Sequence, residues 1–214
     1  MRKKYLVGLV VIATAFHTQL ISPPINLSIA KDNVERYYES GEYDKDLNKI
    51  IAKAKKRFKK IPVKKNSLVI FDVDDTALSD YADSKSIDFG YIPKLSTKWV
   101  LRADAPGISQ TKELYDLIVK RRFKIIFLTG RKYYEHEATI KNLKRQGFTT
   151  FDRLIVRQPD ELKLKAQEYK TNRRKQLTEE GYNIVGNIGD QESDLQGPHS
   201  GYRVKLPNYR YLIP

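Results

Sequence analysis

The sequence contains no cysteine. This absence excludes disulfide bonds, thiolate catalysis, zinc-finger sites and lipid attachment through a cysteine. Histidine is nearly as scarce, and His17, His136 and His199 stand apart from one another. No two of them form the pair at helical spacing that a zinc protease uses, so a site of that kind is excluded as well.

Long apolar runs are also scarce. The one clear run, Tyr5 to Phe16, follows three basic residues and is too short to span a bilayer comfortably. It contains the small-residue pattern Ala13-Thr14-Ala15, and Pro23-Pro24 follows soon after. We predict a signal peptide within residues 1–25 and a secreted or periplasmic protein; an uncleaved N-terminal tether or a buried apolar helix remains an alternative. No further transmembrane span is expected.

Acidic residues are outnumbered, with 26 Asp and Glu against 40 Lys and Arg in 214 residues, a formal charge of +14. This balance favours anionic partners, whether nucleic acid, a membrane surface or phosphorylated small molecules. The densest basic cluster ends a predicted helix over residues 44–60. Because no aromatic residues that could stack on bases alternate with these lysines, we interpret the cluster as a solvated helix face and expect no specific nucleic-acid partner.

After a predicted N-terminal helical segment, residues 26–66, strands and helices alternate. Strands are predicted near residues 67–71, 124–128, 153–156, 183–188 and 202–206, and helices over 109–120, 134–145 and 161–180. The alternation predicts an α/β domain over residues 67–214, with a parallel sheet covered by helices on both faces. Residues 77–105 lack periodicity and are rich in aromatics. They are typical of a small cap whose aromatics either stack on a substrate or form the cap's own core. The aromatics are Tyr81, Phe89, Tyr91 and Trp99.

Polar side chains follow three of the predicted strands. The first strand runs into Asp72 and Asp74, the second into Thr129-Gly130-Arg131, and the fourth into Asp190 and Asp194. Carboxyl ends of parallel strands meet at one edge of a sheet, so these groups are expected to converge. Carboxylates from separate strands suit Mg²⁺, and a hydroxyl and an amine nearby suit a phosphoryl group. Taken alone, each acidic end also fits a solvated turn.

These residues carry a resemblance to a known family. The segments DVDDT, LTGR, YKTNRRKQL and GDQESD resemble, in order and spacing, the motifs of haloacid dehalogenase (HAD) phosphatases. Trp99, the Ala-Pro-Gly at 105–107, LIVRQ at 154–158 and the final KLPNYRYLIP sharpen the resemblance to the acid phosphatases of subfamily IIIB. That subfamily includes proteins like the plant vegetative storage proteins and bacterial lipoprotein acid phosphatases. The resemblance covers residues 68 to 214 and implies a HAD-like Rossmannoid fold.

The resemblance also implies roles for the acids. Asp72 would be the nucleophile that forms an aspartyl-phosphate, and Asp74 would protonate the leaving oxygen and then activate water. Asp72, the backbone carbonyl of Asp74 and Asp190 would bind Mg²⁺. Asp194 would orient waters or the lysine from behind these ligands.

The remaining roles concern the phosphoryl group. Thr129 and the amide of Gly130 would hydrogen-bond its oxygens, and Lys170 would offset its charge in the transition state. Helical phase alone does not choose between Lys170 and its neighbours, but the family pattern points to Lys170. Arg131 would either contact phosphate or form an ion pair at a helix start. The competing lysines are Lys163, Lys165 and Lys175.

We therefore expect a secreted, Mg²⁺-dependent acid phosphatase acting on small phosphomonoesters such as nucleoside monophosphates. The alternative is a storage or binding protein on the same fold with weak catalysis, since plant storage relatives can lose the nucleophile. Asp72 is present here, which favours the enzyme. An acid pH optimum follows only from the resemblance, and the sequence leaves homo-oligomerisation open.

Overall fold

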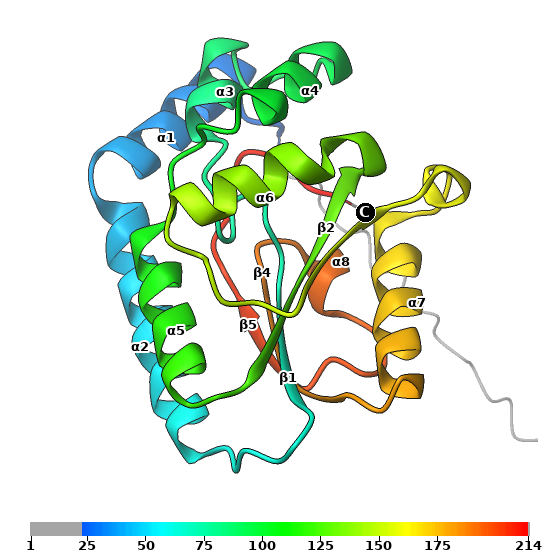
Figure 1. Ribbon diagram of the computed structural model, residues 1–214. Coiled ribbons are helices and arrows are strands. Elements are labelled where there is room, and N and C mark those ends of the chain that lie inside the picture. Colours follow the sequence, from blue (N-terminus) through cyan, green and yellow to red (C-terminus); the bar gives the residue numbers. More distant parts are fainter. Residues whose placement is uncertain (1–22, 214) are drawn as a thin grey trace, which may run out of the picture.

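The computed structural model describes residues 23–213. Its centre is a five-stranded sheet in the order β3-β2-β1-β4-β5, with every neighbouring pair parallel (Figure 1). The α/β fold predicted from the alternation of strands and helices is thereby confirmed. The predicted signal peptide lies almost wholly outside the described residues. The strands are β1 Ser67–Phe71, β2 Lys124–Lys132, β3 Arg153–Arg157, β4 Asn183–Gly189 and β5 Tyr202–Lys205.

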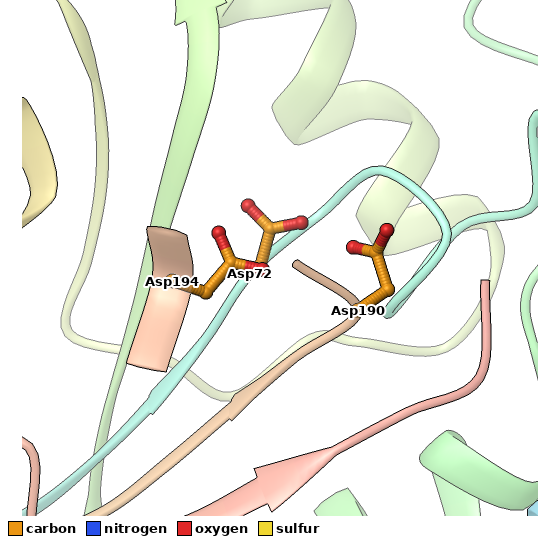
Figure 2. Close-up of side chains that lie close together, drawn as sticks. All are labelled: Asp72, Asp190 and Asp194. Carbon is orange, nitrogen blue, oxygen red and sulfur yellow. The ribbon is translucent and has the colours of Figure 1, made fainter. Parts of the chain in front are cut away.

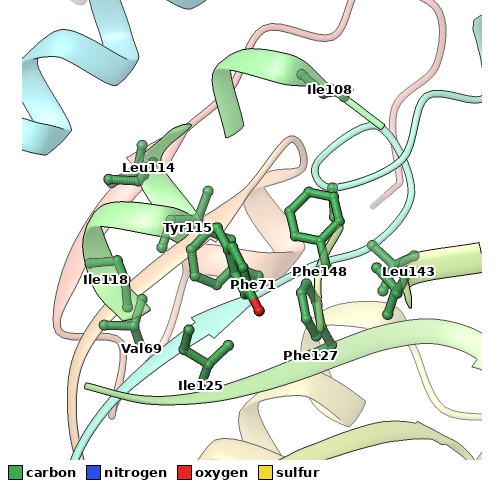
Figure 3. Packing of buried hydrophobic residues seen from close by; sticks show 14 of the residues in the cluster. Val69, Phe71, Ile108, Leu114, Tyr115, Ile118, Ile125, Phe127, Leu143 and Phe148 are labelled. Atoms are coloured by element: carbon green, nitrogen blue, oxygen red, sulfur yellow. The ribbon is translucent and has the colours of Figure 1, made fainter. Parts of the chain in front are cut away.

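Helices cover both faces of this sheet, as expected. One face is covered by α2 (Glu42–Lys60), α5 (Ser109–Lys120) and α6 (His136–Arg145), and the other by α7 (Ala166–Glu179). Side chains of β1 alternate between the two faces, with Val69 and Phe71 toward α5 and with Leu68 and Ile70 toward α7. Figure 3 shows the first of these cores, where aromatic rings from strands and helices interlock.

Helix α2 is fastened to the sheet by one apolar face. Leu47, Ile51, Ala54 and Phe58 recur at helical spacing and are buried, and they belong to the same core as the strands. Phe58 packs so close to Gly186 of β4 that a Cβ there would lie 2.4 Å from its ring. The lysines of α2 lie on its outer side. The division of the chain at residue 66 stays a prediction.

Several element boundaries differ from those predicted. Strand β2 continues through the Thr129-Gly130-Arg131 segment because Lys132 pairs with Arg157 of β3, which hydrophobicity alone does not reveal. Helix α7 begins at Ala166, after a 3₁₀ turn over Pro159–Glu161, and α6 begins at His136, after a 3₁₀ turn over Tyr133–Glu135. The first helix, α1 (Leu27–Glu39), begins directly after Asn26, which caps it by accepting from the amide of Ser28 at 2.9 Å.

The insertion after β1 forms two short helices, α3 (Tyr81–Ser86) and α4 (Pro93–Arg102), which lie with α1 above the carboxyl ends of the strands (Figure 1). Helix α1 braces this cap. Lys85 of α3 forms ion pairs with Glu35 and Glu39, and the ring of Tyr81 stacks on Tyr38 with centroids 4.9 Å apart. Among residues 23–213, no helix has the length and apolar character needed to cross a membrane.

Candidate active site

Three aspartates converge at the carboxyl end of the central strands (Figure 2). Asp72 directly follows β1, Asp190 directly follows β4, and Asp194 lies on the short helix α8 (Glu192–Leu195). Each offers a carboxylate oxygen within 4.8 Å of the others, and all three side chains are buried. The convergence expected from parallel strand ends is present in the structure.

The turn between β4 and α8 is shaped to bring Asp194 back to the sheet. A Cβ on Gly189 would lie 2.3 Å from a carboxylate oxygen of Asp194, so a larger residue would push the acid away. The amide of Gln191 donates to Asp194 Oδ2 at 2.9 Å, and the Asn187 side chain donates to the backbone carbonyl of Asp194 at 2.7 Å. Asp194 is therefore held on two sides.

Lys170 reaches the acids from α7. Its buried ammonium donates to Asp72 Oδ1 at 2.5 Å and to Asp194 Oδ1. Burial alone lowers the pKa of Lys170, but the carboxylates of Asp194 and Asp72 raise it by more. The net pKa is above the usual value, so the side chain is charged. The competing lysines 163, 165 and 175 are exposed. The geometry therefore favours Lys170 over these lysines, and its contact with Asp194 is compatible with the orienting role that the resemblance implies, which stays a prediction.

The acidic group is short of positive charge. Burial raises the pKa of Asp72 well above its usual range, and the neighbouring acids add to the effect against the opposing charge of Lys170. Burial, together with the charges of Asp194 and Asp75, raises the pKa of Asp190 to about 7. One ammonium does not balance the charge of three buried carboxylates, but the ammonium and a divalent cation together would. The three aspartates form a group that can hold a metal ion, and their hard oxygen ligands fit Mg²⁺.

Asp74 forms an ion pair with an arginine. Arg131 donates to Asp74 Oδ1 from Nε at 2.9 Å and from Nη2 at 2.7 Å, and its Nη1 donates to Thr139 at 3.1 Å. Burial raises the pKa of Asp74, but the charge and hydrogen bonds of Arg131 outweigh burial and lower it. Arg131 thus forms an ion pair from strand β2 and not from a helix start; it also lines the cavity described below, and its phosphate contact stays a prediction.

The two residues expected to bind phosphoryl oxygens differ in access. The Thr129 hydroxyl is fully buried; it donates to Asp74 Oδ2 at 3.2 Å and accepts from the Arg131 amide at 3.1 Å. Gly130 lies on the wall of the cavity described next. The predicted phosphate contact of Thr129 stays a prediction, and it requires the hydroxyl to leave Asp74.

A cavity of about 550 Å³ lies over the acids. Asp72, Asp74, Lys170 and Asp190 contribute to its lining, together with residues of the cap and of the C-terminal segment. The cap aromatics lie in different surroundings, and stacking on a substrate stays a prediction. Phe89 and Tyr91 line the cavity, whereas Tyr81 stacks on α1 and Trp99 donates to Asp80 at 2.9 Å.

Comparison with known proteins identifies the family. Residues 19–214 match the family described as HAD superfamily, subfamily IIIB (Acid phosphatase). The chain belongs to this subfamily. It is 36% identical over 185 residues to the stem 28 kDa glycoprotein of Glycine max, covering 84% of this chain and 73% of that protein. It is 35% identical over 188 residues to acid phosphatase 1 of Solanum lycopersicum, covering 85% and 74% of the two chains.

A further relative and a solved structure are similar to this chain. Vegetative storage protein 2 of Arabidopsis thaliana is 36% identical over 195 residues, covering 86% of this chain and 72% of that protein. The class C acid phosphatase of Bacillus anthracis has the same fold, with a TM-score of 0.69 at 21% identity over 87% of this chain and 85% of that one. The HAD-like fold expected from the motifs is confirmed.

The structure of this subfamily IIIB member adds residues that sequence reasoning missed. Asp75 is buried with a left-handed backbone, φ 52°, and forms an ion pair with Arg210. The Tyr211 hydroxyl donates to Asp75 at 2.7 Å, and the Asn208 side chain donates to Asp190 Oδ2 at 2.7 Å. The sequence signal that could have found them is an arginine and two tyrosines within residues 207–214, a segment that begins and ends with proline and has no helical or strand pattern.

The substitution Arg210→Met is expected to lower the free energy of unfolding by about 3 kcal/mol, because it leaves the carboxylate of Asp75 buried without its cation. Urea unfolding in EDTA measures this change. Asp75→Asn in the same chain is expected to recover part of the loss. Arg203→Met, at an exposed arginine, is the matched control and should change stability by less than about 0.5 kcal/mol. Equal stability of the Arg210 and Arg203 variants would contradict the prediction.

Proposed function

We propose that this protein is a Mg²⁺-dependent acid phosphatase that hydrolyses small phosphomonoesters through an aspartyl-phosphate. The observation that carries the proposal is the joint placement of Asp72, Asp74 and Lys170 on the lining of one cavity, with Asp190 beside them. Family membership supports the same reaction class. The cavity volume suits a small organic phosphate, and Phe89 and Tyr91 offer apolar surface to its organic part.

In the first step a carboxylate oxygen of Asp72 attacks phosphorus and the bond to the leaving oxygen breaks. Lys170 holds Asp72 Oδ1, so the other oxygen is free to attack. Asp74 gives its proton to the leaving oxygen. In the second step Asp74 takes a proton from water, whose oxygen attacks phosphorus and releases phosphate and the Asp72 carboxylate. Asp72 and Asp190, with the carbonyl of Asp74, would hold Mg²⁺, which when bound offsets the repulsion between carboxylate and phosphate dianion.

The Arg131–Asp74 ion pair gives a physical reason for an acid optimum. A general acid must carry its proton at the start of the reaction, yet Arg131 lowers the pKa of Asp74. The protonated form is therefore populated only in acidic solution. The first step also needs Asp72 ionised, and bound Mg²⁺ would favour this because its positive charge opposes the burial that raises the pKa of Asp72. With the metal in place, the first step is favoured at acid pH.

A storage protein with weak catalysis is the second candidate. The name of one relative favours it, since the Arabidopsis thaliana protein is a vegetative storage protein. Against it stand the intact acids and the lysine that contacts Asp72. Secretion or periplasmic export rests on residues 1–25 and stays a prediction.

Release of inorganic phosphate distinguishes the two candidates. We expect turnover of several phosphomonoesters, nucleoside monophosphates among them, in acidic buffer with Mg²⁺. EDTA should reduce the rate at least about 100-fold, and added Mg²⁺ should restore it. Circular dichroism in EDTA verifies that the protein stays folded. Absence of turnover from a folded, Mg²⁺-loaded protein would favour the storage protein.

A further inference from the structure

The last seven described residues, 207–213, have no helix or strand, yet they are tied to the active site at several points. This C-terminal strap continues from β5 to the edge of the sheet where β1 and β4 end (Figure 1). Arg210 to Ile213 contribute to the cavity lining. The strap contacts two loops that carry active-site acids, one after β1 and one after β4.

The first contact concerns Asp190, whose carboxylate has about four positions for hydrogen bonds or metal. Asp190 Oδ2 accepts from the Gln191 side chain at 2.6 Å and from the Asn208 side chain at 2.7 Å, so both of its positions are filled. Asp190 Oδ1 accepts from Thr76 at 3.2 Å, which leaves one position. These donors therefore leave Asp190 one position, on Oδ1, with which to bind a metal.

The strap itself is held by several polar contacts. The Asn208 side-chain oxygen accepts from the Arg210 amide at 2.9 Å, a local turn that fixes the side chain. The guanidinium of Arg210 pairs with Asp75 and donates to Ser84 at 2.6 Å, and it lies 5.4 Å from the ring centroid of Tyr38. The Ile213 amide donates to the Gln191 side-chain oxygen at 3.0 Å, which orients the other amide donor on Asp190.

We propose that Asn208 is a positioning residue for the metal site: through its hydrogen bond it fixes Asp190 in the orientation that binds Mg²⁺, and the Arg210–Asp75 pair anchors it there. The inference rests on the proposed function, because it takes Asp190 as a metal ligand. Mutation of a residue that orients a metal ligand in this way typically lowers metal affinity about 10- to 100-fold. The sequence distance between Asn208 and Asp190 explains why no local motif contains both.

The test is the Mg²⁺ affinity of the full chain, measured by isothermal titration calorimetry and by the Mg²⁺ concentration that gives half of the maximal rise in melting temperature. Asn208→Ala is expected to weaken binding about tenfold. Asn208→Ser keeps an oxygen that can accept from the Arg210 amide but is too short to reach Asp190, and it should weaken binding as much. At saturating Mg²⁺ both variants should recover kcat to within about twofold, because Asn208 does not touch substrate.

Tyr209→Ala is the matched control. Tyr209 lies in the strap and its ring contacts Tyr37, but it is exposed and has no hydrogen bond to an active-site acid, so Mg²⁺ affinity should stay unchanged. Equal affinity of wild type and both Asn208 variants would overturn the inference while leaving the proposed function intact. Equal weakening by Tyr209→Ala would also overturn it, because loosening of the strap would then suffice. A wild-type chain that binds no Mg²⁺ would overturn both.

Discussion

Asp72→Asn is expected to reduce kcat on every phosphomonoester by at least about 10⁴-fold, since the amide cannot form the acyl phosphate on which both steps depend. The substitution keeps the shape of the side chain and removes one of three crowded carboxylates. Burial already raises the pKa of Asp72, so loss of its charge should not destabilise the fold. Phosphate release at saturating Mg²⁺ and a melting curve in EDTA measure the two effects.

Two further measurements make this prediction specific. Asp160→Asn removes a carboxylate from an exposed 3₁₀ turn and should leave kcat unchanged. Acid quenching during turnover should trap phosphate on wild-type protein but not on the Asp72 variant. Hydrolysis by the Asp72 variant at the wild-type rate would exclude the aspartyl-phosphate mechanism.

Much of the fold and the acidic centre could be predicted because each strand, and the acid that follows it, is marked by a local sequence pattern. Each buried strand is a short apolar run that stops at a polar residue, and parallel pairing brings those stops together. Asp72 and Asp190 were predictable in this way, as neighbours of strand ends. The side-chain alternation of β1 toward two helical layers follows from the same pattern.

The unpredicted part depends on contacts between distant residues. The apolar run of the second predicted strand stops just before Thr129-Gly130-Arg131, but only the folded chain shows whether the Arg131 guanidinium turns to Asp74 or to a ligand. Arg210 and Asp75 form an ion pair although most of the domain's sequence separates them. The segment that carries Arg210 has no helical or strand periodicity. Helical phase left four lysines as candidates, and burial against Asp72 singles out Lys170. Such pairings depend on tertiary packing, which single-sequence patterns do not encode.

Lys170→Met is expected to affect both catalysis and stability. It removes the ammonium between Asp72 and Asp194, and kcat should fall about 10³-fold because no cation from α7 then offsets transition-state charge. The free energy of unfolding in EDTA should fall by about 3 kcal/mol, because two buried carboxylates lose their partner. The loss should be smaller in acid, where the raised pKa of Asp72 lets its carboxyl take up a proton and shed the unpaired charge.

The chain supplies its own control on the same helix. Lys175 is exposed, and its Nζ lies 3.8 Å from Oε1 of Glu179. Because a surface ion pair of this kind contributes little, Lys175→Met should change the free energy of unfolding by less than about 0.5 kcal/mol and leave kcat unchanged. Mg²⁺ should restore part of the stability of the Lys170 variant, because the ion returns positive charge to the carboxylates, but it should not restore kcat. If the Lys170 variant kept wild-type kcat, phosphate would not need a cation from α7, and Lys170 would be a structural counter-ion for the two acids.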